Sequence, residues 1–122
     1  MIEVGEYVIN QNRLVIGQII EINEERQEAI IKVKRLELLI GFWNIKKHSK
    51  NIIDLIEIGD FVNGHRVVEI KNDEEKVEIG LENEHLINYY IEEQEIKSIL
   101  TKEQYQLNCY VVEGENNVKN KR

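Results

Sequence analysis

Apolar residues along the chain fall in short alternating or continuous runs, and runs with the 3.6-residue period of a helix are scarce. Most of these positions are Ile or Val, whose branched side chains favour strands. Polar turn sequences such as 10–12 and 23–27 separate the runs. The pattern predicts strands at Glu6–Ile9, Leu14–Ile22, Ala29–Arg35, Asp60–Asn63, Arg66–Lys71, Lys76–Leu81, Glu95–Leu100 and Leu107–Glu113.

Three local signals refine this pattern. Asn63-Gly64 is a dipeptide that tolerates positive φ at both central turn positions, which predicts a tight hairpin. Thr101 followed three residues later by Gln104 is a capping-box pattern and predicts one short helix near 102–106. The apolar spacing in 51–57 is typical of a single helical turn.

A sequence echo divides the chain into two parts. The segment IEVGEYV at 2–8 returns as IEIGDFV at 56–62, and 17–33 resembles 64–81, although the first copy has about six more residues after its opening strand. Each copy has the pattern of a three-stranded meander. We therefore expect a mainly β fold, a small barrel or sandwich built from two related meanders at about 2–35 and 56–81.

The remaining segments complete this expectation. Each meander can form most of an SH3-like or OB-like barrel, or the two can pair face to face. C-terminal strands and the short helix occupy 95–113, so that 1–113 form a single domain. The polar residues 114–122 are expected to be a flexible tail.

Composition narrows the class of protein. Hydrophobic content of 42% with 32% charged residues is typical of a globular protein, and the formal net charge of −7 argues against a general nucleic-acid-binding protein. No apolar run is long enough to span a bilayer, and the N-terminus lacks a secretory signal pattern. Cys109 is the only cysteine, which favours a reduced, cytoplasmic setting without an internal disulfide.

One segment concentrates candidate binding chemistry. The stretch GFWNIKKHSKN at 41–51 carries the only tryptophan beside cationic and hydrogen-bonding side chains. Such a group suits a compact anion with an aromatic base, such as a nucleotide. The alternative is a solvated basic loop whose Phe42 and Trp43 fill the core. The candidate ligand-binding residues are Trp43, Lys46, Lys47, His48, Ser49, Lys50 and Asn51, with Arg66 completing the site from the same chain or from a second copy.

Catalytic signatures do not occur in the sequence. The three histidines and Cys109 lack metal-ligand spacing, and Cys109 lies in an aliphatic pattern typical of an inert thiol. There is no glycine-rich phosphate loop, and plentiful acids are also what a solvated surface contains. We therefore expect a protein that is not an enzyme and uses no cofactor or metal.

Two blocks of the sequence carry a resemblance. KHSKNIIDLIEIGDFVNG at 47–64 and IKSILTKEQ at 96–104 resemble motifs of small uncharacterised proteins encoded by phages and prophages of Gram-positive bacteria. The resemblance covers roughly residues 43–113. It implies a protein acting in the host cytoplasm, and small phage proteins of this kind often bind a host component.

These observations lead to one working hypothesis and two alternatives. The hypothesis is a non-enzymatic binding protein, a homo-oligomer, that antagonises host defence by sequestering a small anionic, nucleotide-type signal. It predicts nucleotide binding that is lost in Lys47→Glu. One alternative is an inhibitor that binds a host defence protein, as anti-CRISPR proteins do, through its acidic surface. The other is a structural or assembly component of the phage.

Overall fold

Ten strands form two five-stranded antiparallel sheets in the computed structural model, which describes residues 1–84 and 89–112. The N-terminal sheet has the order β4-β3-β2-β1-β5, and its strands are β1 Tyr7–Asn10, β2 Ile16–Asn23, β3 Glu28–Val33, β4 Leu36–Gly41 and β5 Ile45–Ser49. The C-terminal sheet has the order β10-β6-β7-β8-β9, and its strands are β6 Phe61–Val62, β7 His65–Asn72, β8 Val77–Leu81, β9 Tyr89–Ile91 and β10 Ile99–Leu100. The predicted fold class is confirmed.

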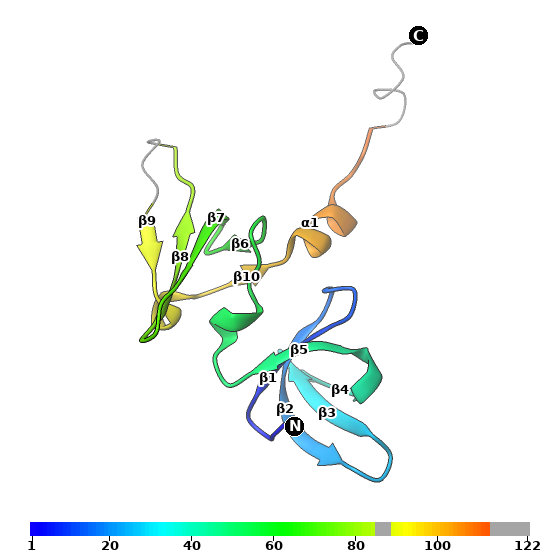
Figure 1. The fold of residues 1–122 in the computed structure, drawn as a ribbon. Coiled ribbons are helices and arrows are strands. Elements are labelled where there is room, and N and C mark those ends of the chain that lie inside the picture. The colour runs from blue at the N-terminus through cyan, green and yellow to red at the C-terminus, as the bar shows by residue number, and fades with distance from the viewer. Residues whose placement is uncertain (85–88, 113–122) are drawn as a thin grey trace.

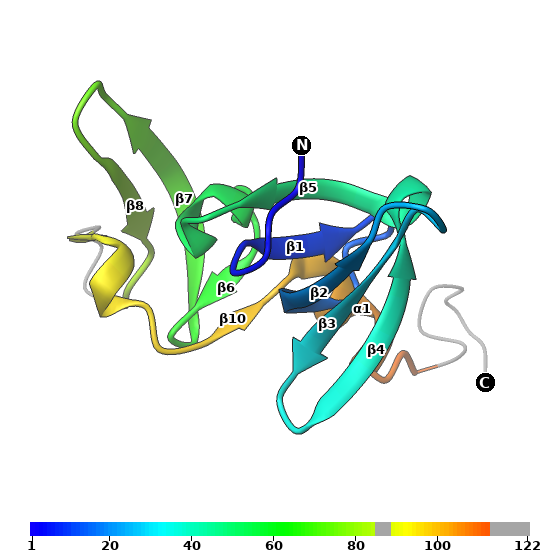
Figure 2. The ribbon, with the colours of Figure 1, turned by 90° about the horizontal axis from the view of Figure 1, so that it is seen from below.

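The two halves of the chain repeat one order of elements. In each half, four strands are followed by a 3₁₀ turn, a fifth strand that pairs with the first, and a short helix. The helical elements are η1 Phe42–Asn44, η2 Ile52–Leu55, η3 Glu93–Glu95 and α1 Lys102–Asn108. We call residues 2–55 the N-terminal repeat and residues 56–108 the C-terminal repeat. Figures 1 and 2 show their sheets side by side, with η2 at the junction between them.

The echoed segments have the same backbone geometry in both repeats. Gly5 has φ 97° and Gly59 has φ 100°, a left-handed conformation that glycine adopts without steric cost. The Gly5 amide donates to the Ile19 carbonyl at 2.8 Å, and the Gly59 amide donates to the Val67 carbonyl at 2.9 Å. Fourteen residues separate the first pair and eight the second, so the first connection is six residues longer, as the sequence indicated.

The acid that follows each glycine closes the same turn. A Glu6 carboxylate oxygen accepts from the Glu3 amide at 2.9 Å, and an Asp60 oxygen accepts from the Glu57 amide at 2.8 Å. Both acids are buried. They therefore hold the backbone turn that starts each repeat instead of facing solvent.

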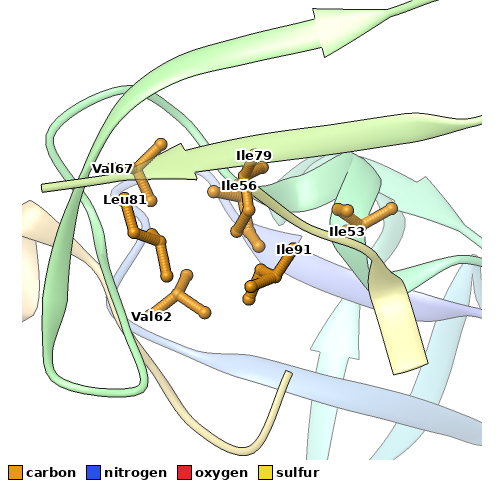
Figure 3. Packing of buried hydrophobic residues seen from close by; sticks show 7 residues of the cluster. All are labelled: Ile53, Ile56, Val62, Val67, Ile79, Leu81 and Ile91. Atoms are coloured by element: carbon orange, nitrogen blue, oxygen red, sulfur yellow. The ribbon is translucent and has the colours of Figure 1, made fainter. Parts of the chain in front are cut away.

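Each repeat also buries the same five strand positions. These positions belong to the first four strands of each sheet, and the side chains are fully or nearly fully buried. They are Val8, Ile19, Ala29, Ile31 and Ile40 in the N-terminal repeat, and Val62, Val67, Ile79, Leu81 and Ile91 in the C-terminal repeat. Ile53 and Ile56 extend the second cluster, and Figure 3 shows all seven side chains converging beneath β7 and β8. Each repeat thus has its own small core.

Some predicted elements differ from the observed ones. The strands β4, β5 and β9 were not predicted, and the predicted strand Glu95–Leu100 contains η3 and only the short β10. The predicted strand at Leu107–Glu113 is wrong, because α1 continues to Asn108 and residues 109–112 form no strand. The predicted tail at 114–122 lies outside the described residues.

All three local signals are confirmed, and the apolar spacing in 51–57 corresponds to the 3₁₀ turn η2. Asn63 and Gly64 have φ of 55° and 85°, and they join β6 to β7 in a tight hairpin. Thr101 caps α1: its hydroxyl accepts from the Gln104 amide while the Gln104 side chain accepts from the Thr101 amide. The α1 helix therefore starts where the capping box predicts.

Candidate binding groove between the two repeats

A buried ion pair joins the two repeats. Arg13 lies in the turn between β1 and β2 and has φ 60°, and its side chain is only 2% exposed. Its guanidinium donates to both carboxylate oxygens of Asp60, at 2.9 and 2.6 Å, and to the Leu55 carbonyl at 3.1 Å. This fork-shaped contact fixes the long turn of one repeat against the opening turn of the next.

Asp60 is fully buried and fully hydrogen-bonded. Besides Arg13, it accepts from the amides of Glu57, at 2.8 Å, and Lys102, at 3.0 Å. Burial alone opposes ionisation of this carboxyl, but the hydrogen bonds from Arg13 and from the two amides outweigh it, so the pKa of Asp60 is lowered. The hydrogen bond to Asp60 likewise raises the pKa of Arg13. Both groups are therefore charged at neutral pH.

The TKEQ residues at 101–104 bind helix α1 to this ion pair. Thr101 donates its hydroxyl proton to the Arg13 carbonyl at 2.7 Å, and Glu103 accepts from the Arg13 guanidinium at 2.8 Å. The Gln104 amide group donates to the Leu14 carbonyl at 2.8 Å. Lys102 contacts the Glu57 carboxylate at 3.1 Å. Thr101, Glu103 and Gln104 therefore hold the two repeats together, and Lys102 holds α1 against the opening turn of its own repeat.

The predicted binding residues of β5 make similar structural contacts. His48 Nδ1 lies 3.0 Å from a Glu6 carboxylate oxygen. The Ser49 hydroxyl donates to Asp54 at 2.6 Å and accepts from the Asn51 amide at 3.0 Å, which shapes the entry into η2. These side chains position the link between the repeats.

Three of the predicted cationic contacts lie beside carboxylates. Lys46 is 3.9 Å from Glu57, and Lys50 is 3.4 Å from Glu3. Arg66 contacts Glu82 at 2.9 Å in the C-terminal repeat. Lys47 is exposed on β5. A ligand bound at the basic segment, residues 41–51, would have to compete with Glu57 for Lys46 and with Glu3 for Lys50.

Trp43 lies apart from the other predicted residues. Its side chain is 80% exposed, so it does not fill the core, whereas Phe42 packs against the N-terminal cluster. Trp43 precedes β5 and Lys50 follows it, and a five-residue strand separates them by roughly 15 Å. The structure therefore does not bring Trp43 and Lys50 together around one compact ligand.

A groove does lie between the two repeats. Two adjoining hollows of about 640 and 370 Å³ share four side chains, Tyr7, Ile16, Ile52 and Ile99. These four residues come from β1, β2, η2 and β10, so both repeats contribute to the floor. Gly17 lines the smaller hollow, where its lack of a side chain allows Val33 to approach closely. The groove is thus built by the way the repeats pack.

Lysines line the groove around this apolar floor. Lys32 and Lys34 line the smaller hollow, and Lys50 and Lys97 line the larger one. All four are exposed. Within residues 1–84 and 89–112, no carboxylate forms an ion pair with Lys32, Lys34 or Lys97. The groove therefore combines an apolar floor with positive charge that is open to a ligand.

Sequence reasoning identified only one residue of this groove, Lys50. Arg13 was missed because a single arginine in a polar turn has the appearance of a solvated residue. Its partner Asp60 lies 47 positions away, and no local pattern links the two. Ile52 and Ile99 were missed as binding residues because an apolar residue in a strand or helical turn indicates a core position.

Other classes of site are not apparent in the described part of the chain. Within it, no group of three or more His, Cys, Asp or Glu residues could hold a metal ion. None of its helices has the length and apolar character needed to cross a membrane. Comparison with protein-family models, curated proteins and solved structures finds no match.

Proposed function

We propose that this chain is a non-enzymatic, phage-encoded binding protein that sequesters a small anionic, nucleotide-type signal in the groove between its repeats. In the cytoplasm of a host cell, such binding would antagonise a defence response that depends on the signal. The observation that carries the proposal is the groove floor shared by both repeats, with Lys32, Lys34 and Lys97 around it in no ion pair with a carboxylate of the described residues.

The groove chemistry fits a nucleotide better than a purely ionic ligand. Tyr7 and the three isoleucines of the floor supply the apolar surface that an aromatic base requires. Lys97 and Lys34 supply positive charge for phosphate groups. Both hollows lie within the range of about 300–1,000 Å³ that is typical of small-molecule sites.

The ion pair between the repeats supports the same proposal. A groove formed by two separate units binds well only if the units are held in place before the ligand arrives. The contacts of Asp60 with Arg13 and Lys102 supply that constraint, because they link both repeats and α1. The sequence blocks that carry the phage resemblance also line the groove, through Lys50 and Ile52 of the first block and Lys97 and Ile99 of the second.

Calorimetry with paired charge reversals tests this proposal. A panel of mononucleotides and cyclic dinucleotides is titrated into the wild type, Lys97→Glu and Lys47→Glu. Both lysines are exposed, but only Lys97 lines the groove. We expect at least one nucleotide to bind, binding to be lost in Lys97→Glu, and Lys47→Glu to bind like the wild type.

The opposite pattern assigns the ligand to the basic segment of β5. Loss of binding in Lys47→Glu with retention in Lys97→Glu overturns the groove assignment. A panel that gives no heat with the wild type overturns the nucleotide proposal altogether.

A third hollow favours the alternative of a protein inhibitor. It measures about 380 Å³ and is lined by six acids: Asp54, Asp73, Glu74, Glu75, Glu92 and Glu93. Lys76, the one cation in its lining, already contacts Glu92 at 3.1 Å and Glu78 at 3.4 Å. Such a surface suits a basic region of a host protein. This alternative predicts salt-sensitive co-purification with one host protein that is lost in Glu74→Lys/Glu75→Lys and kept in Lys97→Glu.

A further inference from the structure

The outer faces of the two sheets differ at one equivalent position. In the C-terminal repeat, Tyr90 pairs across strands with Gly80, and its ring lies so close that a Cβ on Gly80 would be 2.8 Å from it. The Tyr90 hydroxyl donates to Glu69, and the Lys71 ammonium lies 4.0 Å from the ring centre. Polar partners thus cover this face of the C-terminal sheet.

At the equivalent position, the N-terminal sheet is apolar and open. Leu39 takes the place of Tyr90, pairs with Ile30, and is 66% exposed. Residues two apart on a strand share a face, so Gly41 lies on the side of Leu39. The Trp43 ring occupies the space over Gly41, where a Cβ would lie 2.4 Å from Trp43 Nε1. Leu39 and Trp43 therefore form an exposed apolar patch.

This patch lies on an unpaired edge strand. Of the strands in the described residues, β4 pairs only with β3, so its other side presents free backbone groups. Natural edge strands are usually short, charged or covered, which prevents pairing with another chain. The sequence of β4, LELLIG, has a single charge, Glu37, and its Leu36 is also largely exposed. The β4 edge lacks the usual protection.

The same chain contains a segment whose residues favour a strand but that pairs with no strand of the described residues. Residues Cys109–Val112, with the sequence CYVV, follow α1 and begin in extended conformation. Tyr110, Val111 and Val112 are all exposed, and no hydrogen bond between backbone amide and carbonyl groups joins them to any described residue. Aromatic and β-branched residues favour strands, which is why the sequence predicted a strand here. The segment lacks only a neighbouring strand.

We propose that Cys109–Val112 of one copy adds as a sixth strand to the β4 edge of a second copy. Figure 1 shows the chain after α1 running away from the N-terminal sheet, so the segment does not reach β4 of its own copy in this conformation. Backbone hydrogen bonds supply the pairing, and Leu39 with Trp43 supplies the apolar anchor. The edge and the added strand thus come from one sequence, and no other protein is needed.

The mass of the full-length chain in solution tests this contact. Light scattering after gel filtration is measured over a range of concentrations, with reductant present because Cys109 is an exposed thiol. We expect concentration-dependent association of the wild type. Leu39→Lys places a charge in the patch, and Val111→Pro removes a backbone donor from the added strand. Each variant alone is expected to be monomeric.

A control and a mixing experiment separate this contact from other kinds of association. Val4→Lys alters an apolar side chain that is 60% exposed but lies outside the patch, so it should associate like the wild type. Leu39→Lys retains an intact C-terminal segment, and Val111→Pro retains an intact β4 edge. An equimolar mixture should therefore form a heterodimer that neither variant forms alone.

Three outcomes overturn the proposal. They are a wild type that stays monomeric at its highest soluble concentration, a Val111→Pro variant that still associates, and a mixture that remains monomeric. Leu39 and Val111 lie outside both cores, so unchanged thermal unfolding of the monomeric variants verifies that they are folded.

Discussion

Arg13 and Asp60 form a two-pronged ion pair at 2.9 and 2.6 Å, with the guanidinium 2% exposed and the carboxylate completely buried. The two residues come from different repeats. Helix α1 adds its own contacts to both, through Glu103 and the Lys102 amide. This pair therefore links the two cores into one structure.

Removing one partner of the ion pair should greatly lower the free energy of unfolding. Asp60→Ala leaves a buried guanidinium without its main acceptor, which destabilises a protein by about 3–5 kcal/mol. The exposed pair of Arg66 with Glu82 is the matched control, and Arg66→Ala should cost less than about 1 kcal/mol. Urea unfolding of both variants measures the difference. Equal, small losses in the two variants would contradict the role of Asp60.

Stability should also depend on the charge of Asp60 at acidic pH. Its pKa is lowered in the folded state, so its contribution is fully present above the unfolded pKa of about 4 and is lost as pH falls through the folded value. The wild type should therefore lose stability below about pH 4 more steeply than Asp60→Asn. Urea midpoints measured from neutral to acidic pH test this, and parallel curves would argue against a charged Asp60.

The N-terminal cap of α1 should contribute less to the free energy of unfolding than the ion pair does. Thr101→Ala removes both the hydrogen bond to the Arg13 carbonyl and the cap of the helix, and loss of a cap typically costs about 1 kcal/mol. Thr101→Ser retains the hydroxyl and should recover most of this loss. Urea unfolding compares the three proteins, and a serine variant as unstable as the alanine variant would show that the methyl group matters more than the hydroxyl.

Trp43 gives a direct optical test of the apolar patch. Because its side chain is 80% exposed, native fluorescence should have the long emission wavelength of a hydrated indole and should be readily quenched by acrylamide. Gly41→Ala should move the ring, since the new Cβ would lie 2.4 Å from Nε1. Measurements belong at low concentration, where self-association does not cover the patch. A blue-shifted, protected emission there would place Trp43 in a core.

The repeated fold was predictable where local chemistry determines structure. The glycines at 5 and 59 and the acids after them produced the echo in the sequence, and they make the same hydrogen bonds in both repeats. The strands β4 and β5 were missed because LELLIG does not alternate and IKKHS is mostly polar. The strand expected after Leu107 failed because the capping box at Thr101 starts a helix that continues to Asn108.

The candidate site was less predictable because it depends on contacts distant in sequence. The basic segment attracted attention through its composition, yet His48 and Lys50 are held beside Glu6 and Glu3. The groove floor joins Tyr7 to Ile99, and no sequence period relates them. Only the packing of the two repeats brings these residues together.

The most direct test of the proposed function is a residue-by-residue map of where a nucleotide binds. Isotopically labelled wild type is titrated with the tightest-binding member of the nucleotide panel, and backbone amide and Trp43 indole signals are followed by NMR. The groove predicts the largest shifts near Ile52, Lys97 and Ile99, with the Trp43 signal nearly unchanged. Shifts confined to Trp43 and the amides of 46–47, or no shifts with any nucleotide, would contradict it.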